Sequence, residues 1–275
     1  MLALPVIGWL VFFLLIPMGF VAVYSFLSRG PYGNVIFTFT TNNYPRAGDA
    51  LYLGIYWQSV QLAIAATVVC LALGFPAAYV IATAPRRWRQ LLVTIIMAPF
   101  LVNFIVRAYA IRVLLGIDGP INRLLLSLAI ISSPLGLNDT WFAVWLGMVT
   151  NYLPFMVLPL YVVLDRLDFG LLEAAADLGA SGPHVLRYVL LPLAWPGILS
   201  GAVLVFVPAL GEFMIPDILG GARTMLIGNL ISDQFLRARH WPFGATLAVL
   251  LIGVMLLGCA LEWRFGPEDG DGRLS

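Results

Sequence analysis

The stretch DFGLLEAAADLGASGPHVLRYVLLP, residues 168–192, is the longest polar segment between two apolar runs of this chain, yet its pattern is helical. Asp168 is placed to cap a first helix, because its side chain can accept backbone N–H groups at a helix start. Gly179 is placed to end that helix, since a left-handed residue, usually glycine, commonly follows the last helical turn. The segment therefore predicts a helix that ends in a glycine turn.

A second helix is predicted directly after this turn. Ser181 and Pro183 supply a typical start, because serine caps helices and proline fits their first turn. This helix is expected to run to Leu191 and Pro192, and a membrane span is expected to begin near Leu193.

The first of these helices has the composition of a docking element. Alanines lie between the carboxylates of Glu173 and Asp177, which gives a smooth face flanked by two acids. Such a face can lie close against a groove of another protein while the acids pair with basic residues at its rim. The alternative that the residues leave open is a pair of amphipathic helices lying on a membrane surface.

Around this segment the chain is strongly apolar. Of its 275 residues, 61% are hydrophobic and 11% are charged, whereas soluble domains average roughly 45–50% apolar and about 25% charged residues. The formal net charge is +1, and every basic residue is arginine. The composition argues against a soluble fold, and the small net charge gives no field that would favour nucleic acid.

Several apolar runs are long enough to cross a hydrocarbon core, which takes roughly 20 helical residues. They cover residues 2–26, 57–82, 91–115, 141–164, a run from about 193, and 243–263. We therefore predict an all-α polytopic membrane protein with about six spans. The expected domains are a transmembrane domain over residues 1–263, with the polar loop at about 165–192, and a short tail over residues 264–275.

A basic hairpin at residues 85–89 sets the expected orientation. It holds Arg86, Arg87 and Arg89 between two spans, and short loops rich in arginine tend to stay in the cytoplasm. The loop at 165–192 and both termini then also face the cytoplasm. The apolar stretch at 124–131, in the second external loop, is too short to span.

The polar loop resembles a known signature. Glu173-Ala174-Ala175, Gly179 and the residues Val-Leu-Leu-Pro at 189–192 match the EAA motif of ABC importer permeases, with valine for the usual isoleucine at the first of these last four positions. In that family the EAA helix sits in a cleft of the cytoplasmic ATPase and couples ATP hydrolysis to the membrane helices. The coupling residues that the resemblance implies are Glu173, Ala174, Ala175, Asp177, Gly179, Leu191 and Pro192.

Further segments resemble the B-type, or H-type, permease of spermidine/putrescine importers, and this likeness covers nearly the whole chain. They are residues 99–110, 152–156, 207–221 and 227–235. The resemblance implies a type I ABC importer permease fold in a bacterial inner membrane, with polyamines or another small organic ion as substrate. It implies as partners an ATPase dimer that binds ATP and magnesium, a second permease of the C/I type, a periplasmic substrate-binding protein and membrane lipid.

Two acids in or beside the fifth apolar run are candidates for the substrate path. Glu212 and Asp217 lie near Pro208 and Pro216, which interrupt regular helix. A carboxylate at the bilayer centre costs about 2.5–3.5 kcal/mol on insertion scales, so it normally faces protein or water. We expect an acidic path suited to a cation, the alternative being that Glu212 reaches the outer interface and is simply solvated.

Tyr109 and Tyr152 are the aromatic candidates for the same path, because a ring face attracts an ammonium group. The alternative is an interfacial belt of aromatic residues. Arg107 and Arg112 are expected to extend toward the interface, unless Arg107 pairs with one of the acids.

The chain shows no motif for chemistry of its own. It has no G-x-x-x-x-G-K-[ST] run for ATP and no H-E-x-x-H pattern, so we expect no enzyme, no resident cofactor and no metal. His184 and His240 have no second ligand at metal-binding spacing, and Cys70 and Cys259 lie in apolar runs as expected of small core residues.

Two other classes of membrane protein are alternatives to an importer subunit. An intramembrane enzyme would need a polar catalytic cluster at depth, and a secondary transporter would show inverted repeats with paired broken helices. Neither pattern is evident in the sequence. An importer subunit powered by a partner remains the favoured interpretation.

Overall fold

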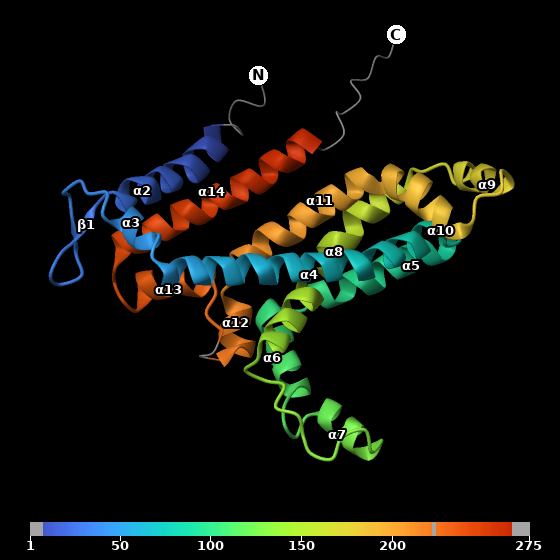
Figure 1. Cartoon of the computed structure of the whole chain (residues 1–275), viewed down its shortest axis with the longest axis horizontal. Helices are drawn as coiled ribbons and strands as arrows, with labels where there is room; N and C mark the ends of the chain where they lie inside the picture. The colour runs from blue at the N-terminus through green and yellow to red at the C-terminus, as the bar shows by residue number, and fades with distance from the viewer. Residues whose placement is uncertain (1–7, 222–223, 266–275) are drawn as a thin grey trace, which may run out of the picture.

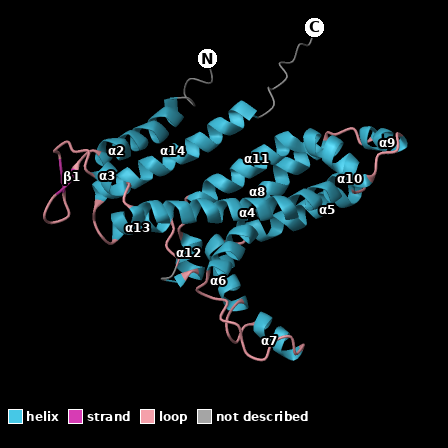
Figure 2. Ribbon diagram, viewed as in Figure 1, coloured by secondary structure: helices cyan, strands magenta, loops and turns pink. Residues whose placement is uncertain are grey.

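The computed structural model describes residues 8–221 and 224–265, with side chains to residue 260, and most of this part is helical (Figure 1, Figure 2). In chain order the elements are η1 (Val11–Leu15), α2 (Ile16–Ser25), β1 (Ser28–Arg29), β2 (Val35–Ile36), α3 (Asn43–Ala47), α4 (Ala50–Thr83), α5 (Arg86–Met97), η2 (Ala98–Leu101), α6 (Phe104–Leu114), α7 (Pro120–Ser127), α8 (Trp141–Asp165), α9 (Gly170–Asp177), α10 (Gly182–Val185), η3 (Leu186–Leu190), α11 (Leu191–Leu210), α12 (Met214–Leu219), α13 (Ile227–Leu236) and α14 (Trp241–Phe265). Strands β1 and β2 pair antiparallel in one small hairpin.

Three long helices, α4, α8 and α11, pack against one another and form the core of the bundle. They meet closely around Met156 of α8, which is fully buried. A β-carbon on Gly74 of α4 would lie 2.9 Å from Met156 Cγ, and one on Gly201 of α11 would lie 2.7 Å from Met156 Sδ. Small residues thus let the backbones approach, as is usual where packing rather than hydrophobic burial holds membrane helices together.

The first and last spans form a second, separate pair. Helix α2 packs against α14, and Figure 1 shows the two side by side above the core. Thr246 of α14 donates a hydrogen bond to the Ser25 carbonyl at 3.1 Å. Only 6% of the span 8–25 is buried in the described chain, so this helix adds little to the core.

Five described helices are long and apolar enough to cross a membrane, and the bent pair of 86–101 and 104–114 supplies a sixth span if its two arms are counted together. The predicted spans at 141–164 and 243–263 are confirmed closely by α8 and α14. The second span begins earlier than predicted, at Ala50, and the short helix α3 lies directly before it. The tail expected from residue 264 begins inside α14, and its remainder lies outside the described residues.

The predicted span at 91–115 corresponds to a bent pair of helices rather than to one straight helix. Helix α5 ends at Met97, a 3₁₀ turn follows, and α6 leaves at an angle of 89°. Pro99 explains the break, because proline lacks the N–H that a continuing α-helix needs. Asn103 then restarts the helix by accepting the Ile105 N–H at 2.9 Å.

The predicted boundary between a second loop helix and the fifth span is also wrong. Residues 182–210 form one continuous helical segment, in which α10 passes through the π-helical turn η3 into α11. The wider π-turn lies directly before Pro192 and provides local adjustment of the kind that accommodates proline in membrane helices. The second arm of the polar loop at 165–192 is therefore a direct extension of a core helix.

The end of the bundle opposite α9 is closed by polar contacts. His240 is buried, its Nδ1 accepts the Phe243 backbone N–H at 3.2 Å, and Arg46 Nη1 lies 3.2 Å from its Nε2. Burial first, and then the positive charges of Arg46 and Arg29, hold the pKa of His240 below its usual range. A protonated ring would have no lone pair for either donor.

Candidate functional site

The first part of the candidate coupling surface is α9, at the far end of the bundle in Figure 1. Asp168 Oδ1 accepts the Gly170 N–H at 2.9 Å, so the predicted contact at the helix start is present, although Phe169 holds the cap position. Glu173, Ala174 and Asp177 are exposed, and Ala175 is half-buried. The helix thus presents its acids outward, where they are free for a partner.

The glycine turn predicted after α9 is confirmed. Gly179 has φ of +88°, in the range that favours glycine. Its N–H donates to the Ala176 carbonyl at 2.9 Å, and the Ala180 N–H donates to the Ala175 carbonyl at 3.1 Å. This pair of bonds is the Schellman arrangement, which satisfies the last carbonyl groups of a helix.

The tip of the loop is apolar as well as acidic. Leu178 is 90% exposed, although a leucine in water forgoes roughly 1.5–3 kcal/mol of burial. Together with Glu173 and Asp177 it gives a surface suited to a protein groove, and we call these three residues the loop tip. Nothing in the described part of the chain covers it.

Leu191 and Pro192, the last predicted coupling residues, lie away from the loop tip. They are the first two residues of α11, where Leu191 is half-buried and Pro192 is exposed. The structure therefore places them at the point where the loop joins the core rather than on α9.

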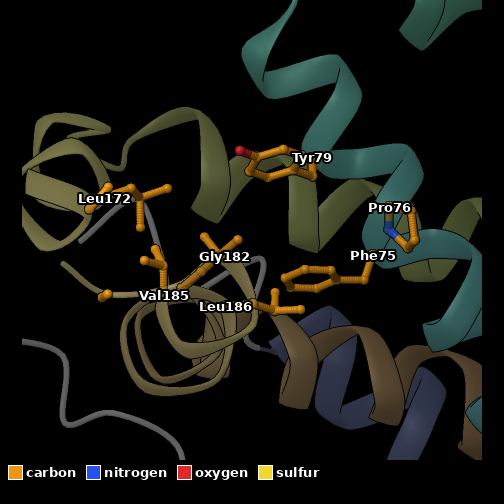
Figure 3. Close-up of a pocket in the computed structure, with 10 residues that line it drawn as sticks. Phe75, Pro76, Tyr79, Leu172, Gly182, Val185 and Leu186 are labelled. Carbon is orange, nitrogen blue, oxygen red and sulfur yellow. The ribbon is translucent and has the colours of Figure 1, made fainter.

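A cavity of about 460 Å³ lies behind the loop, between α4 and the two arms of the coupling segment (Figure 3). Its lining is almost wholly apolar: Phe75, Pro76, Tyr79, Leu172, Ala176, Ala180, Gly182, Val185, Leu186 and Leu190. The α4 members could not be predicted from the sequence, because contact between residues a hundred positions apart leaves no local pattern.

Glu212 and Tyr152, two of the predicted path residues, are brought together. Tyr152 Oη donates to Glu212 Oε2, and Glu212 Oε1 accepts the backbone N–H groups of residues 213, 214 and 215 at 2.9–3.3 Å. Glu212 is only 9% exposed. The carboxylate thus fixes the turn between α11 and α12, and the expectation of a solvated interface residue does not hold.

Asp217 and Tyr109 are the exposed members of the predicted path. Asp217 lies on α12 and accepts a hydrogen bond from Asn229 Nδ2 at 2.6 Å, while the same amide group donates to the Phe213 carbonyl at 2.7 Å. Tyr109 is 55% exposed on α6, which packs against α12. Asn229 therefore ties Asp217 to the segment that Glu212 holds, a role that no spacing in the sequence indicated.

The two arginines of the third span have different surroundings. Arg112 Nη1 lies 3.1 Å from Asp139 Oδ1 and also donates to the Ile218 carbonyl of α12. Arg107 makes no ion pair within the described residues, and its guanidinium lies 5.5 Å from the centre of the Phe100 ring. The possible pairing of Arg107 with an acid is not found.

The described residues contain no group of three or more His, Cys, Asp or Glu side chains that could hold a metal ion. Cys70 is buried between core helices, as expected, with Sγ 3.7 Å from the Val149 carbonyl oxygen. Cys259 is exposed, so its assignment to the core of this chain is wrong.

Comparison with known proteins agrees with this architecture. The family described as "Binding-protein-dependent transport system inner membrane component" matches residues 71–263. The spermidine/putrescine transport system permease protein PotB of Escherichia coli K12 is 42% identical over 259 residues, covering 94% of each chain. PotB of Haemophilus influenzae is 40% identical over 94% of this chain and 91% of its own. The E. coli inner membrane ABC transporter permease protein YdcU is 32% identical over 78% of this chain and 72% of its own.

Solved structures share the fold at lower identity. A chain of a bacterial ABC transporter involved in the import of the acidic polysaccharide alginate aligns with a TM-score of 0.71 at 17% identity, over 97% of this chain and 95% of its own. A chain of the MetNI methionine ABC transporter aligns with a TM-score of 0.54 at 19% identity, over 77% of this chain and 93% of its own. At these identities the likeness concerns the fold alone.

Proposed function

The chain belongs to the family of binding-protein-dependent transport system inner membrane components, and from this premise we propose that it forms half of a path that imports polyamines. As a member it is a multi-pass inner-membrane permease subunit of an ABC importer. The observation that carries the polyamine assignment is the 42% identity, over 94% of both chains, to a permease named for spermidine and putrescine. The runner-up substrate is another small organic ion, since the family is broader than its polyamine members.

The proposed complex places the loop tip in a cleft of a cytoplasmic ATPase dimer. The exposed acids Glu173 and Asp177 and the 90% exposed Leu178 support this proposal, because they offer charge and apolar area to one partner surface. ATP and magnesium belong to that ATPase, and this chain carries no cofactor. A second permease of the C/I type and a periplasmic substrate-binding protein complete the importer.

The proposed orientation follows from the loop tip and the basic hairpin, which lie at the same end of the bundle, as Figure 1 shows for α9 and the α4–α5 turn. Both are cytoplasmic in this proposal, as are both termini. The turn between α11 and α12, with Glu212, then lies toward the periplasm. A polyamine delivered by the binding protein would meet this end first.

The proposed path uses the four predicted residues in two roles. Asp217 and Tyr109 are exposed and offer a carboxylate and a ring face to an ammonium group. Glu212 acts from behind, since its oxygens already accept four hydrogen bonds, one of them from Tyr152. Its negative charge still attracts a cation, although less than a carboxylate in direct contact would, because the Coulomb energy falls with distance.

Uptake by the reconstituted complex tests the proposal. Proteoliposomes with both permeases and the ATPase, supplied with the binding protein, are expected to accumulate radiolabelled spermidine and putrescine and to hydrolyse ATP faster when loaded binding protein is present. An organic anion of similar size serves as the control. Import of the anion without either amine would refute the polyamine assignment, and absence of any ATP-dependent import would refute the importer function.

A further inference from the structure

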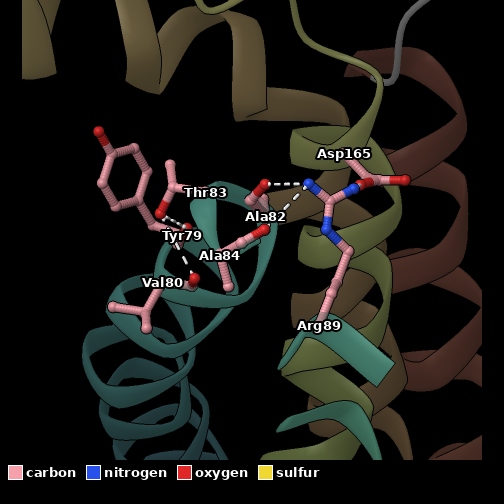
Figure 4. Close-up of polar contacts among 7 residues, drawn as sticks. All are labelled: Tyr79, Val80, Ala82, Thr83, Ala84, Arg89 and Asp165. Atoms are coloured by element: carbon pink, nitrogen blue, oxygen red, sulfur yellow. Dashed lines mark hydrogen bonds and ion pairs between the residues drawn. The ribbon is translucent and has the colours of Figure 1, made fainter. Parts of the chain in front are cut away.

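The base of the coupling segment is tied to a helical hairpin that is remote from it in sequence (Figure 4). Arg89, in the first turn of α5, pairs through Nη1 with Oδ1 of Asp165, the last residue of α8. Arg89 Nη2 also donates to the Ala82 carbonyl at 2.7 Å and approaches the Ala84 carbonyl at 3.5 Å. One guanidinium thus joins the ends of α4 and α8 to the start of α5.

Both charges of this pair lie where a helix dipole disfavours them. Asp165 is an acid at the negative end of α8, and Arg89 is a base at the positive end of α5. Each such placement costs typically 0.3–1 kcal/mol unless another charge compensates it. Arg89 compensates the charge of Asp165 and also donates to the free carbonyl of Ala82 at the end of α4. Each charge of the pair thus offsets the unfavourable interaction of the other with its helix dipole.

A second contact ties the same elements together on the apolar side. The ring of Tyr79, on the last turns of α4, meets the ring of Phe169 edge to face, with centroids 6.2 Å apart. Phe169 is the residue just before α9. A cavity of about 500 Å³ between these contacts is lined by Tyr79, Arg89, Asp165, Phe169 and Glu173, among others.

The consequence concerns how a displacement of α9 reaches the membrane helices. Through the chain, α9 is joined only to α8 and α11. Helix α4 packs against both of them but has no covalent link to the loop. The guanidinium of Arg89 supplies a noncovalent link between α4 and the end of α8, where the loop begins. Because Arg89 lies on α5, it also connects the first arm of the bent third span to the loop.

We propose that Arg89 and Asp165 are positioning residues that make the α4–α5 hairpin move with the coupling segment, so that ATPase-driven movement of α9 reaches all three core helices. This inference rests on the proposed function, because it requires an ATPase at the loop tip. Neither residue touches substrate or nucleotide. Without the pair, α9 can shift while α4 and α5 lag, and ATP is hydrolysed with less import.

The test is the number of spermidine molecules imported per ATP hydrolysed in the reconstituted complex. Asp165→Asn keeps the size of the side chain and leaves the Arg89 contacts to α4 in place, so the complex is expected to assemble. The pair is half-exposed, with 30% and 35% of the two side chains accessible, so solvent screens the attraction between the charges. We therefore place its contribution at the low end of the usual range of coupling free energies. We expect the ratio to fall by roughly fivefold.

Matched variants separate coupling from a loss of charge or of structure. Arg87→Gln removes a charge from the same hairpin, where Arg87 has no ion-pair partner within the described residues, and it is expected to leave the ratio unchanged. Arg89→Asp combined with Asp165→Arg restores the pair in reverse and should recover part of the ratio lost by either single change. Recovery is only partial because the reversed arginine starts from α8 rather than beside the Ala82 carbonyl.

Three results would overturn the inference: an unchanged ratio in Asp165→Asn, an equal fall in Arg87→Gln, or no recovery in the reversed pair. These outcomes are distinct from failure of the proposed function. In that case the wild-type complex itself would show no import driven by ATP, and no ratio could be measured for any variant.

Discussion

Replacing Gly179 tests whether the turn after α9 is required for coupling. Gly179 has φ of +88°, and no atom outside its own chain neighbours lies within 4 Å of the place a β-carbon would take. Alanine therefore meets no steric clash, and its cost comes from the backbone alone. That cost is about 1–2 kcal/mol for an L-residue in left-handed conformation.

A shift of this size changes the population of the turn by a factor of roughly 5–30. Because the turn is exposed and held by two backbone hydrogen bonds, we expect α9 to lose its fixed direction while the core helices remain folded. Gly179→Ala should then reduce import and the ATP hydrolysis linked to it. Gly179→Val should reduce them further, to the point of uncoupling or disassembly, and Gly179→Asn should retain more, since asparagine tolerates this conformation.

Gly182 offers a matched control three positions later. A β-carbon there also meets nothing within 4 Å, but its φ is not positive, so Gly182→Ala costs no strain. The measurements are copurification of the ATPase, ATP hydrolysis stimulated by loaded binding protein, and uptake in proteoliposomes. Normal assembly with normal transport-linked hydrolysis in Gly179→Val, or equal defects at both glycines, would refute the role given to this turn.

A single cysteine at the exposed Ser181 should crosslink to the ATPase and resist impermeant reagents added from the periplasmic side; labelling from that side would reverse the proposed topology. Glu212→Gln keeps an oxygen for its three backbone donors but removes the charge, so uptake should fall, more for spermidine than for putrescine, with assembly and basal ATP hydrolysis intact. Unchanged uptake of both amines would remove Glu212 from the path. Burial and the charges of Arg46 and Arg29 lower the pKa of His240, so the unfolded chain binds the proton more readily than the folded chain. The neutral His240 therefore contributes to the stability of the fold above about pH 6.5, and this contribution is lost as the pH falls. The unfolding temperature of the detergent-solubilised complex should fall at acidic pH, and it should fall less in His240→Gln. An equal fall in both proteins would contradict this account.

The sequence by itself determined the class of the protein, the approximate positions of most spans and the turn at Gly179. Apolar runs of sufficient length have few alternatives in a bilayer, because a chain in lipid must satisfy its backbone polar groups internally. The helix end at Gly179 was equally local, since the hydrogen bonds that define it link residues within six positions. The EAA pattern could be recognised in the sequence because all its members lie in one contiguous stretch, and the coupling role that it predicts is part of the proposal.

The tertiary structure decided what depended on contacts between distant segments. Pro99 lies at a bend of 89°, whereas Pro192 follows a π-turn inside one continuous helical segment, and the sequence pattern did not tell the two prolines apart. The burial of Glu212 against Tyr152, sixty positions earlier, and the link from Arg89 to Asp165 arise only when helices meet. A charge in a membrane protein pairs with the group that the fold brings within hydrogen-bond distance, and no spacing along the chain specifies that group.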